Sequence, residues 1–307
     1  MPAYNAEKFI RTSIDSILNQ TYANIELLIA DDCSTDNTRS VIESYTDPRI
    51  KLHHNTENSG YLKTCNKLLA LCQGEYLSFM DADDYSSIDR FAVQLKALQD
   101  NPEYAVCGCN LLYVSDAGKE LYCSNFVENS DEIRKYMLKG EFHYSPNTFL
   151  FTREVGQKAG FYHPYFDRIG AEDYYWTAVI IDKFKIINLP QALYYYRFNP
   201  DSISGDLSDN PKKLYSSNVV KRLIEQRNAT GTDDLEQGRI ADLDAFVAKL
   251  TEEFVKDNSV YLKTLAQRSF NNGDKSKAIN YIWRAIKKKP FNMAYYRDLL
   301  YMMRTKA

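Results

Sequence analysis

The chain has 307 residues, a formal net charge of −3 and 44% hydrophobic residues, a composition typical of a globular protein. No apolar run approaches the roughly 18 residues of a membrane span, and no signal peptide is recognisable, so we expect a cytoplasmic protein. The six cysteines lack a zinc-binding spacing and are expected to be thiols in a reducing compartment. Residues 251–307 carry 12 basic and 5 acidic side chains, which predicts a basic C-terminal module on an acidic body.

The first hundred residues alternate between short apolar runs and segments with helical periodicity. We expect strands at 1–4, 25–30, 50–54 and 75–80, and helices at 6–19, about 35–45, 61–72 and 86–99. This alternation is typical of an α/β fold with a doubly wound, mainly parallel sheet.

Two of the predicted strands end in clustered acids. Asp31 and Asp32 follow the strand at 25–30, and Asp81, Asp83 and Asp84 follow the strand at 75–80. Ligands of open α/β sheets bind at the carboxyl ends of the strands, and clustered carboxylates need a cation or a donor network to offset their repulsion. The pattern indicates a metal site for a phosphorylated ligand; the alternative is a solvated acidic turn.

The second hundred residues are less regular. Strands are expected at 105–114, 120–123 and 147–151, and a helix begins at Glu172 and Asp173. These two acids either do chemistry or only stabilise the helix N-terminus. Arg197 either contacts a diphosphate or forms a salt bridge that holds the loop Asn199–Gly205, a candidate lid.

From about residue 206 to 307 the pattern is helical, and residues 259–292 resemble one tetratricopeptide-type helical pair. Lys287, Lys288 and Lys289 follow Trp283 and Ile286 on one of these helices. The basic run either contacts anionic lipid or is a solvated helix end. Nucleic-acid binding is not expected, because the body is acidic and no nucleic-acid motif is present.

A series of short motifs runs along residues 1–205. They are MPAYNAEKFI at 1–10, SILNQTY at 16–22, DDCSTDNT at 31–38, Asn58-x-Gly60, GEYLSFMDADD at 74–84, Asp89-Arg90, Ser145-Pro146-Asn147, Glu172-Asp173 and Tyr196-Arg197. With these motifs the chain resembles the family 2 glycosyltransferases of bacterial surface glycans, which are inverting enzymes of the GT-A fold. The resemblance implies a catalytic domain at 1–205 and a helical module at 206–307.

The resemblance also implies roles at the matching positions. Pro2, Tyr4, Asp32 and Asp81 would line the nucleotide pocket, with Asn58 and Gly60 as further candidates. Asp83 would ligate Mn²⁺ or Mg²⁺ on the diphosphate. Asp173 would be the general base, with Glu172 beside it, and the donor would be a nucleotide sugar, most simply UDP-linked. The acceptor would be a glycan or a lipid-linked sugar at the inner membrane face.

Two departures from the family pattern stand out. The family has several apolar residues before the MPAYN segment, which form a central first strand, whereas this chain starts at Met1; we expect a trimmed or shortened start and a weaker sheet. Cys33 stands where glycine is usual, so the turn is expected to differ locally.

Two rivals to a glycosyltransferase remain. A nucleotidyltransferase would normally have a glycine-rich, basic phosphate loop at the first turn, which MPAYNAEK is not. A shortened, non-catalytic nucleotide- or glycan-binding protein is the second rival. The presence of Asp32, Asp81, Asp83 and Asp173 together argues against it.

Overall fold

The computed structural model describes residues 1–198, 213, 215–271 and 273–305, in two compact units. Unit 1 comprises residues 1–198 and 216–233, and the other described residues, mainly those from Asp234 onward, form unit 2. None of the helices in these described ranges is long and apolar enough to cross a membrane.

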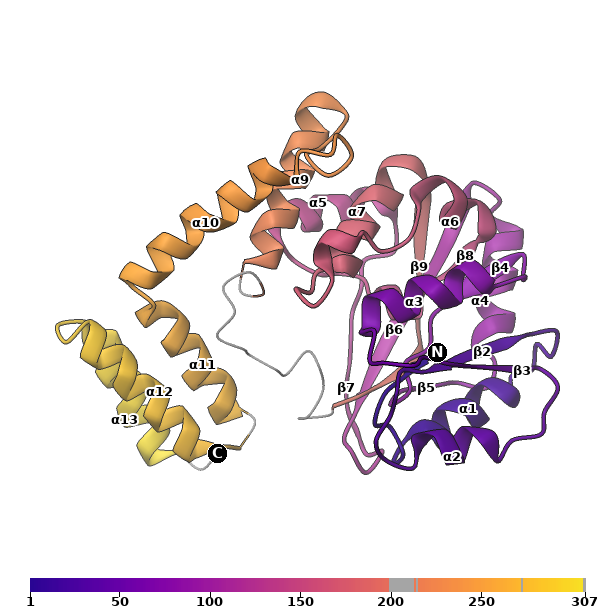
Figure 1. Ribbon diagram of the computed structural model, residues 1–307, viewed down its shortest axis with the longest axis horizontal. Helices are drawn as coiled ribbons and strands as arrows, with labels where there is room; N and C mark the ends of the chain where they lie inside the picture. The colour runs from indigo at the N-terminus through magenta and orange to yellow at the C-terminus, as the bar shows by residue number, and fades with distance from the viewer. Residues whose placement is uncertain (199–212, 214, 272, 306–307) are drawn as a thin grey trace. The chain divides into compact units, whose positions relative to one another are not determined.

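Unit 1 begins with a three-stranded parallel sheet in the order β1-β2-β3 (Figure 1). Its strands are β1 (Pro2–Ala3), β2 (Leu27–Asp31) and β3 (Ile50–His54), and its helices are α1 (Ile10–Leu18), α2 (Thr38–Glu43) and α3 (Tyr61–Leu71). All five residues of β2 are buried, because alternate side chains face helices on opposite sides of the sheet. Leu27 and Ile29 pack in the core with α1, whereas Leu28 and Ala30 pack with Leu68 of α3.

The first helix begins four residues later than the sequence predicted. Residues 5–7 are held instead by the loop before α2: Asn5 Oδ1 accepts a hydrogen bond from Thr35 N at 2.8 Å, and Ala6 N donates to Thr38 Oγ1 at 2.7 Å. These tertiary hydrogen bonds compete with the helical ones, and α1 starts at Ile10.

The second sheet is mixed, with the path β4-β8-β6-β9-β5 and β7 beside β6. Its strands are β4 (Tyr76–Ser78), β5 (Tyr85–Ser86), β6 (Tyr104–Val114), β7 (Glu120–Cys123), β8 (Leu150–Thr152) and β9 (Lys185–Arg197). Only β6 and β9 pair in parallel; the other pairs are antiparallel. The α/β class is therefore confirmed, with parallel pairing concentrated in the first sheet and a mixed second sheet.

A cavity of about 460 Å³ lies between β2 and β4, where the two sheets meet without pairing. Its lining includes Met1, Leu28, Leu68, Leu77 and Met80. The Met1 amine donates to Leu28 O at 2.8 Å, so β1 enters this space alongside β2. The edges of the two sheets at β1–β2 and β4 are thus separated by this cavity.

Helices cover the second sheet. They are α4 (Arg90–Asp100), α5 (Ser130–Lys139), α6 (Arg153–Ala159) and α7 (Glu172–Lys183), with 3₁₀ turns at Pro146–Thr148 and Pro164–Phe166, and α9 (Ser216–Thr230) lies against two of these helices. The predicted helix at 86–99 begins only at Arg90, because Tyr85 and Ser86 form β5 against β9. Helix α9 packs on α7 and α5, although the sequence placed residue 206 onward in a separate module.

Unit 2 is helical. Its helices are α10 (Ile240–Lys256), α11 (Ser259–Asn271), α12 (Lys275–Lys288) and α13 (Met293–Arg304). Helices α11 and α12 pack as a hairpin through Leu262, Ala266, Ala278 and Ile282, and α13 adds Leu299 to the same core.

Candidate active site

The acidic turn after β4 directly follows two buried residues. Phe79 and Met80 are buried, the chain turns through Asp81–Asp84, and β5 follows directly. Ser13 Oγ of α1 donates to the backbone oxygen of Ala82 at 2.9 Å and to that of Asp84 at 2.5 Å. The first helix therefore fixes the backbone of the turn.

Both carboxylate oxygens of Asp81 have donors. Tyr61 Oη donates to Oδ1 at 3.0 Å, and Asn147 Nδ2 donates to Oδ2 at 2.6 Å. Burial raises the pKa of Asp81 to about 7, and the negative charge of Asp83 adds to the rise. Asp81 is thus poised between its neutral and charged forms near neutral pH.

Asp84 and Arg197 hold the other side of the turn. Asp84 is buried, and its Oδ1 accepts a hydrogen bond from Arg197 N at 2.7 Å. Burial raises the pKa of Asp84, and the charges of Asp81 and Asp83 act in the same direction. The Arg197 side chain is itself buried and donates to the backbone oxygens of Asp83 at 2.9 Å and Asp116 at 2.7 Å.

These contacts bear on the two roles expected for Arg197. Its guanidinium braces the backbone of the acidic turn, and its ring contacts are with Phe9 and Tyr85. The loop Asn199–Gly205, expected as its salt-bridge partner and as a lid, lies outside the described residues.

The acidic turn is suited to a divalent cation. In the described ranges no three acid, histidine or cysteine side chains converge as a ready-made metal cage. A hard cation such as Mg²⁺ needs only one or two carboxylates when substrate phosphates and water complete its shell. Burial, and then the repulsion between these carboxylates, raises the pKa values of Asp81 and Asp84, and the charge of a bound cation would offset both effects. The donor set therefore fits Mn²⁺ or Mg²⁺.

Glu172 and Asp173 begin α7, directly after a strained turn. Arg168, Gly170 and Ala171 all have positive φ, at +57°, +85° and +69°, and such strain in non-glycine residues is typical of functional sites. Burial raises the pKa of Glu172 to about 7, with Asp173 as the next cause, and burial also raises the pKa of Asp173.

The two acidic segments lie close together in space, because Phe79, just before the acidic turn, packs edge-on against Trp176 of α7 with 5.6 Å between the ring centroids. The charge of Asp173 contributes to the raised pKa of Asp81, and the charge of Asp81 contributes to that of Glu172. Segments about 90 residues apart in sequence thus form one acidic centre. It combines a candidate cation site with a candidate base.

Asp32 organises the loop before α3. Its carboxylate accepts hydrogen bonds from Asn55 Nδ2 at 2.6 Å and from the backbone N of Ser59 and Gly60, both at 2.9 Å. Gly60 has φ +89°, which glycine adopts freely. Asp32 is buried. Its direct contact with a nucleotide base remains a prediction.

The remaining nucleotide-pocket candidates are more open. Tyr4 is 47% exposed, and Pro2 pairs with Ala30 in the first sheet. Asn58 accepts from Arg168 Nη2 through its backbone oxygen at 2.8 Å, which ties the loop before α3 to the turn before α7.

Two supporting residues were not predicted from the sequence. Tyr61 donates to Asp81, and the fully buried Arg90 donates to Asn147 O at 3.1 Å and Ser78 Oγ at 2.8 Å. Arg90 therefore positions Asn147, which in turn contacts Asp81. The Asp89-Arg90 motif was a signal for Arg90, whereas nothing local in the sequence points to Tyr61.

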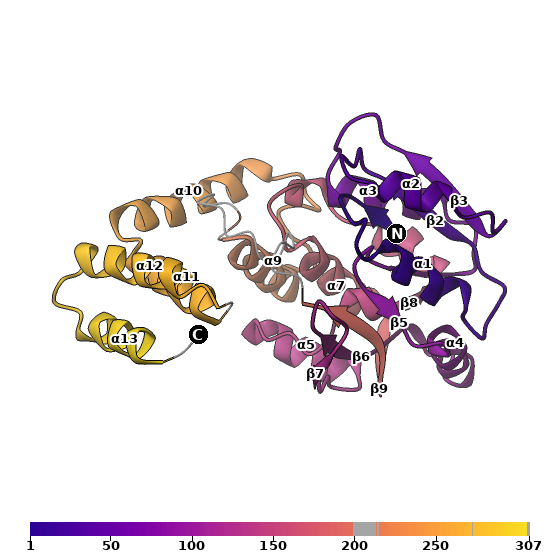
Figure 2. The ribbon, with the colours of Figure 1, turned by 90° about the horizontal axis from the view of Figure 1, so that it is seen from below.

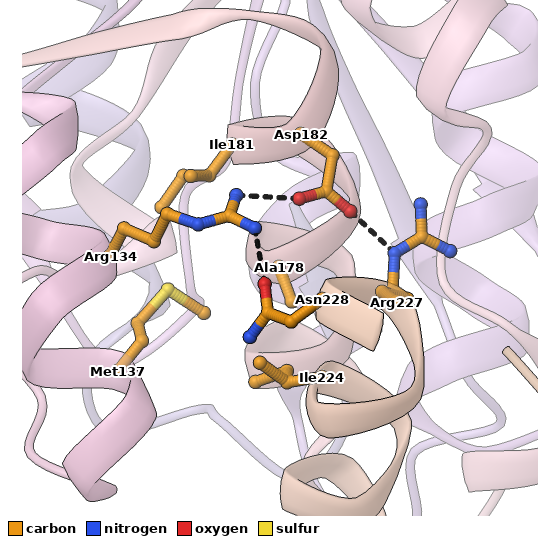
Figure 3. Close-up of a pocket in the computed structure, with 8 residues that line it drawn as sticks. All are labelled: Arg134, Met137, Ala178, Ile181, Asp182, Ile224, Arg227 and Asn228. Atoms are coloured by element: carbon orange, nitrogen blue, oxygen red, sulfur yellow. Dashed lines mark hydrogen bonds and ion pairs between the residues drawn. The ribbon is translucent and has the colours of Figure 1, made fainter. Parts of the chain in front are cut away.

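A second polar cluster attaches α9 to the helix that begins with the candidate base (Figure 3). Asp182 of α7 pairs with Arg134 at 2.6 Å and with Arg227 of α9 at 2.5 Å. Arg227 also pairs with Asp233 at 2.9 Å, and Tyr175 of α7 donates to the same carboxylate at 2.9 Å. The pocket beside this cluster has a volume of only about 10 Å³, too small for a substrate.

Comparison with known proteins gives the same picture at the level of the family. The model of glycosyl transferase family 2 matches residues 1–168. A 212-residue stretch is 30% identical to the Escherichia coli protein WfgD, a UDP-Glc:alpha-D-GlcNAc-diphosphoundecaprenol beta-1,3-glucosyltransferase, covering 67% of this chain and 78% of that one. A 101-residue stretch is 39% identical to the putative teichuronic acid biosynthesis glycosyltransferase TuaG of Bacillus subtilis, covering 32% of this chain and 40% of that one.

Solved structures share the fold at low sequence identity. Staphylococcus aureus TarS 1–349 in complex with UDP-GlcNAc superimposes with a TM-score of 0.60 at 22% identity, over 94% of this chain and 79% of that one. The mannosyltransferase PcManGT from Pyrobaculum calidifontis, in complex with GDP-Man and Mn²⁺, gives a TM-score of 0.53 at 18% identity, over 95% and 86% of the two chains.

Proposed function

The chain belongs to glycosyl transferase family 2, and from that premise we propose that it transfers a sugar from a nucleotide sugar to an acceptor hydroxyl with inversion at the anomeric carbon. UDP is the proposed nucleotide, as in the names of WfgD and of the TarS complex. The proposed acceptor is a glycan or a lipid-linked sugar used in surface polysaccharide synthesis, at the cytoplasmic face of the membrane.

The observation that carries the proposal is the single acidic centre formed by Asp81–Asp84 and Glu172-Asp173. Inverting transfer needs two separate functions: stabilisation of a departing diphosphate, and removal of a proton from the attacking hydroxyl. The two acidic segments supply one group for each function.

We assign the base to Asp173. The acceptor oxygen attacks the anomeric carbon while the bond from that carbon to the diphosphate oxygen breaks, and the hydroxyl proton passes to the Asp173 carboxylate. Burial raises the pKa of Asp173 above its usual value, which makes it a stronger base than an exposed aspartate. Glu172, whose pKa is raised to about 7, is the competing assignment.

We assign the cation site to the acidic turn, with Asp83 as the ligand of Mn²⁺ or Mg²⁺. A bound cation would offset the charge that develops on the leaving diphosphate. Asp81 and its donors Tyr61 and Asn147 would orient the ribose side of the donor. Pro2, Tyr4 and Asp32 would line the base pocket, with Asn58 and Gly60 in the adjoining loop.

The first experiment is titration calorimetry of UDP into the full chain, with Mn²⁺ and then with EDTA. We expect binding that requires the metal in the parent protein and is lost in Asp83→Asn. The matched control is Asp100→Asn, which removes the same charge from an exposed residue of α4. Metal-dependent binding that survives in Asp83→Asn would reject the cation site.

Turnover separates the two possible bases. Asp173→Asn is expected to bind UDP normally and to lose at least about a thousandfold in kcat, whereas Glu172→Gln should keep most of the activity. The opposite result would assign the base to Glu172. If the parent protein binds UDP but hydrolyses or transfers no sugar from UDP-glucose, UDP-GlcNAc or GDP-mannose, the non-catalytic rival is favoured.

A further inference from the structure

The turn between α12 and α13 holds two large apolar side chains in solvent. Pro290 and Phe291 occupy its centre, and Asn292 N donates to Lys289 O at 3.1 Å to close it. Asn292 also caps α13, because its Oδ1 accepts from Ala294 N at 3.1 Å. Phe291 is 94% exposed and Met293 is 74% exposed, so a defined turn, held by its own hydrogen bonds, presents both.

The last two turns of α12 add an aromatic ring and three cationic side chains beside this turn. Trp283 is 46% exposed, and Arg284, Lys287 and Lys288 are also exposed. Residues 283 and 287, like 284 and 288, are four apart and lie on the same face of the helix. We call the six residues Trp283, Arg284, Lys287, Lys288, Phe291 and Met293 the α12–α13 tip.

Negative charge is scarce around the tip. In residues 275–305, which contain α12, α13 and the turn between them, the sequence has eight basic residues and a single acid, Asp298. Asp298 pairs with Lys263 at 3.1 Å. The neighbouring Asp257 pairs with Lys289, so neither acid neutralises the lysines of the tip.

The residues of the tip do not contribute to the core of unit 2. The opposite face of α12 already packs there through Ala278, Ile282, Ala285 and Ile286, all buried. Figure 2 shows the turn that joins α12 and α13 at one end of these two helices. An apolar cluster that is surrounded by cations and left in solvent marks an interaction surface.

We propose that the α12–α13 tip docks unit 2 on an anionic lipid bilayer, with Phe291, Trp283 and Met293 entering the headgroup region. Aromatic rings are favoured at the bilayer interface, and lysines near an anionic surface are attracted to it. Charge complementarity selects anionic lipid over a neutral surface. The proposal goes beyond the glycosyl transfer and does not depend on it.

The test is co-sedimentation of the full chain with vesicles of phosphatidylcholine, with and without about one third phosphatidylglycerol. We expect binding only to the anionic vesicles, weakened by high salt. Lys287→Gln/Lys288→Gln should bind roughly thirtyfold more weakly. Phe291→Ser should bind roughly tenfold more weakly and should lose the part of the binding that resists salt.

Matched controls come from unit 1. Lys135→Gln/Lys139→Gln removes an exposed lysine pair from α5, and Leu121→Ser removes a 50% exposed apolar side chain from β7. Both controls should bind as the parent does, and circular dichroism should show that all variants are folded. The proposal is overturned by equal binding to both kinds of vesicle, by no binding, or by equal losses in the tip variants and the controls. It is also overturned if Phe291→Ser dissolves a dimer while vesicle binding is absent.

Discussion

Asn147 Nδ2 donates a 2.6 Å hydrogen bond to Asp81 Oδ2, joining the 3₁₀ turn before β8 to the acidic turn after β4. A donor to a carboxylate stabilises its charged form and lowers its pKa. Asp81 already has a pKa of about 7, so its charge at neutral pH depends on such donors. Arg90 holds the backbone of Asn147 and thereby the direction of its amide.

We therefore predict that Asn147→Ala raises the pKa of Asp81 and weakens Mn²⁺-dependent UDP binding by roughly tenfold near neutral pH. The loss should shrink at about pH 8.5, where Asp81 is charged in both proteins. Calorimetry at the two pH values is the measurement. Asn101→Ala, at the end of α4, is the control, since its amide donates to Ala97 O and not to an acid. A loss that does not change with pH would contradict the role of Asn147 in Asp81 ionisation.

The raised pKa values of Asp81 and Glu172 predict how stability varies with pH when metal is absent. Each has a pKa of about 7 in the folded chain, against usual values of 3.8 and 4.5. Between about pH 4 and pH 7 the folded state therefore binds more protons than the unfolded state, and the free energy of unfolding falls as pH rises. Both groups are partly accessible, so we expect a fall on the order of 2 kcal/mol across this window.

Melting temperatures in EDTA, from about pH 5 to pH 8, measure this effect. Asp81→Asn and Glu172→Gln should each flatten the decline, because an amide does not titrate. Glu103→Gln, at an exposed position, should leave it unchanged. Parallel profiles of melting temperature against pH for all four proteins would mean that burial does not raise the pKa values of these two acids.

The sequence correctly predicted those elements of the fold that are determined by residues close together in the chain. The strand at Ile50–His54 and the start of α7 at Glu172 agree with the sequence, because apolar patterning and the placement of acids in the first turn of a helix act over a few residues. The acidic turn was recognised because its aspartates directly follow an apolar run. The packing of α9 on α7 could not be inferred from local sequence, because it involves contacts such as the pairing of Arg227 with Asp182, 45 residues away. The donors to Asp81, Tyr61 and Asn147, are likewise 20 and 66 residues away from it in sequence.

Cys33 has φ +65°, in the left-handed region that glycine adopts freely. The sequence suggested that a cysteine would alter this turn; the backbone instead adopts the strained conformation. A non-glycine residue in this conformation lowers the free energy of unfolding by roughly 1–2 kcal/mol. Glycine would remove this strain but has more freedom in the unfolded chain, so the net gain is about half of that amount. We predict that Cys33→Gly raises the melting temperature by about 2 °C.

Cys33→Ala is the control for that prediction, because it removes the exposed thiol but keeps the Cβ atom. It should melt with the parent protein or below it. Equal gains for alanine and glycine would point to the thiol, and not to backbone strain, as the source of the effect. Differential scanning calorimetry under reducing conditions distinguishes the two.

The cavity between β2 and β4 contains the buried amine of Met1. Burial lowers the pKa of this amine, because a charged group loses its hydration there. Its hydrogen bond to Leu28 O continues the parallel register in which Pro2 faces Ala30. A residue placed before Met1 would replace the charged amine with an amide that can still donate to Leu28. Further residues would run beside Leu27 and reach the lining at Leu77.

We predict that an added N-terminal segment of five Val and Ile residues, after an initiating Met, raises the melting temperature by roughly 5 °C. Its side chains would bury apolar surface in the cavity, and its backbone would pair with β2. The gain should be larger at about pH 6 than at pH 9, because the charged amine of the parent chain is most costly when protonated. A segment of the same length made of Ser and Gly is the control and should give little gain. If the two extensions melt alike, the cavity does not accept a strand.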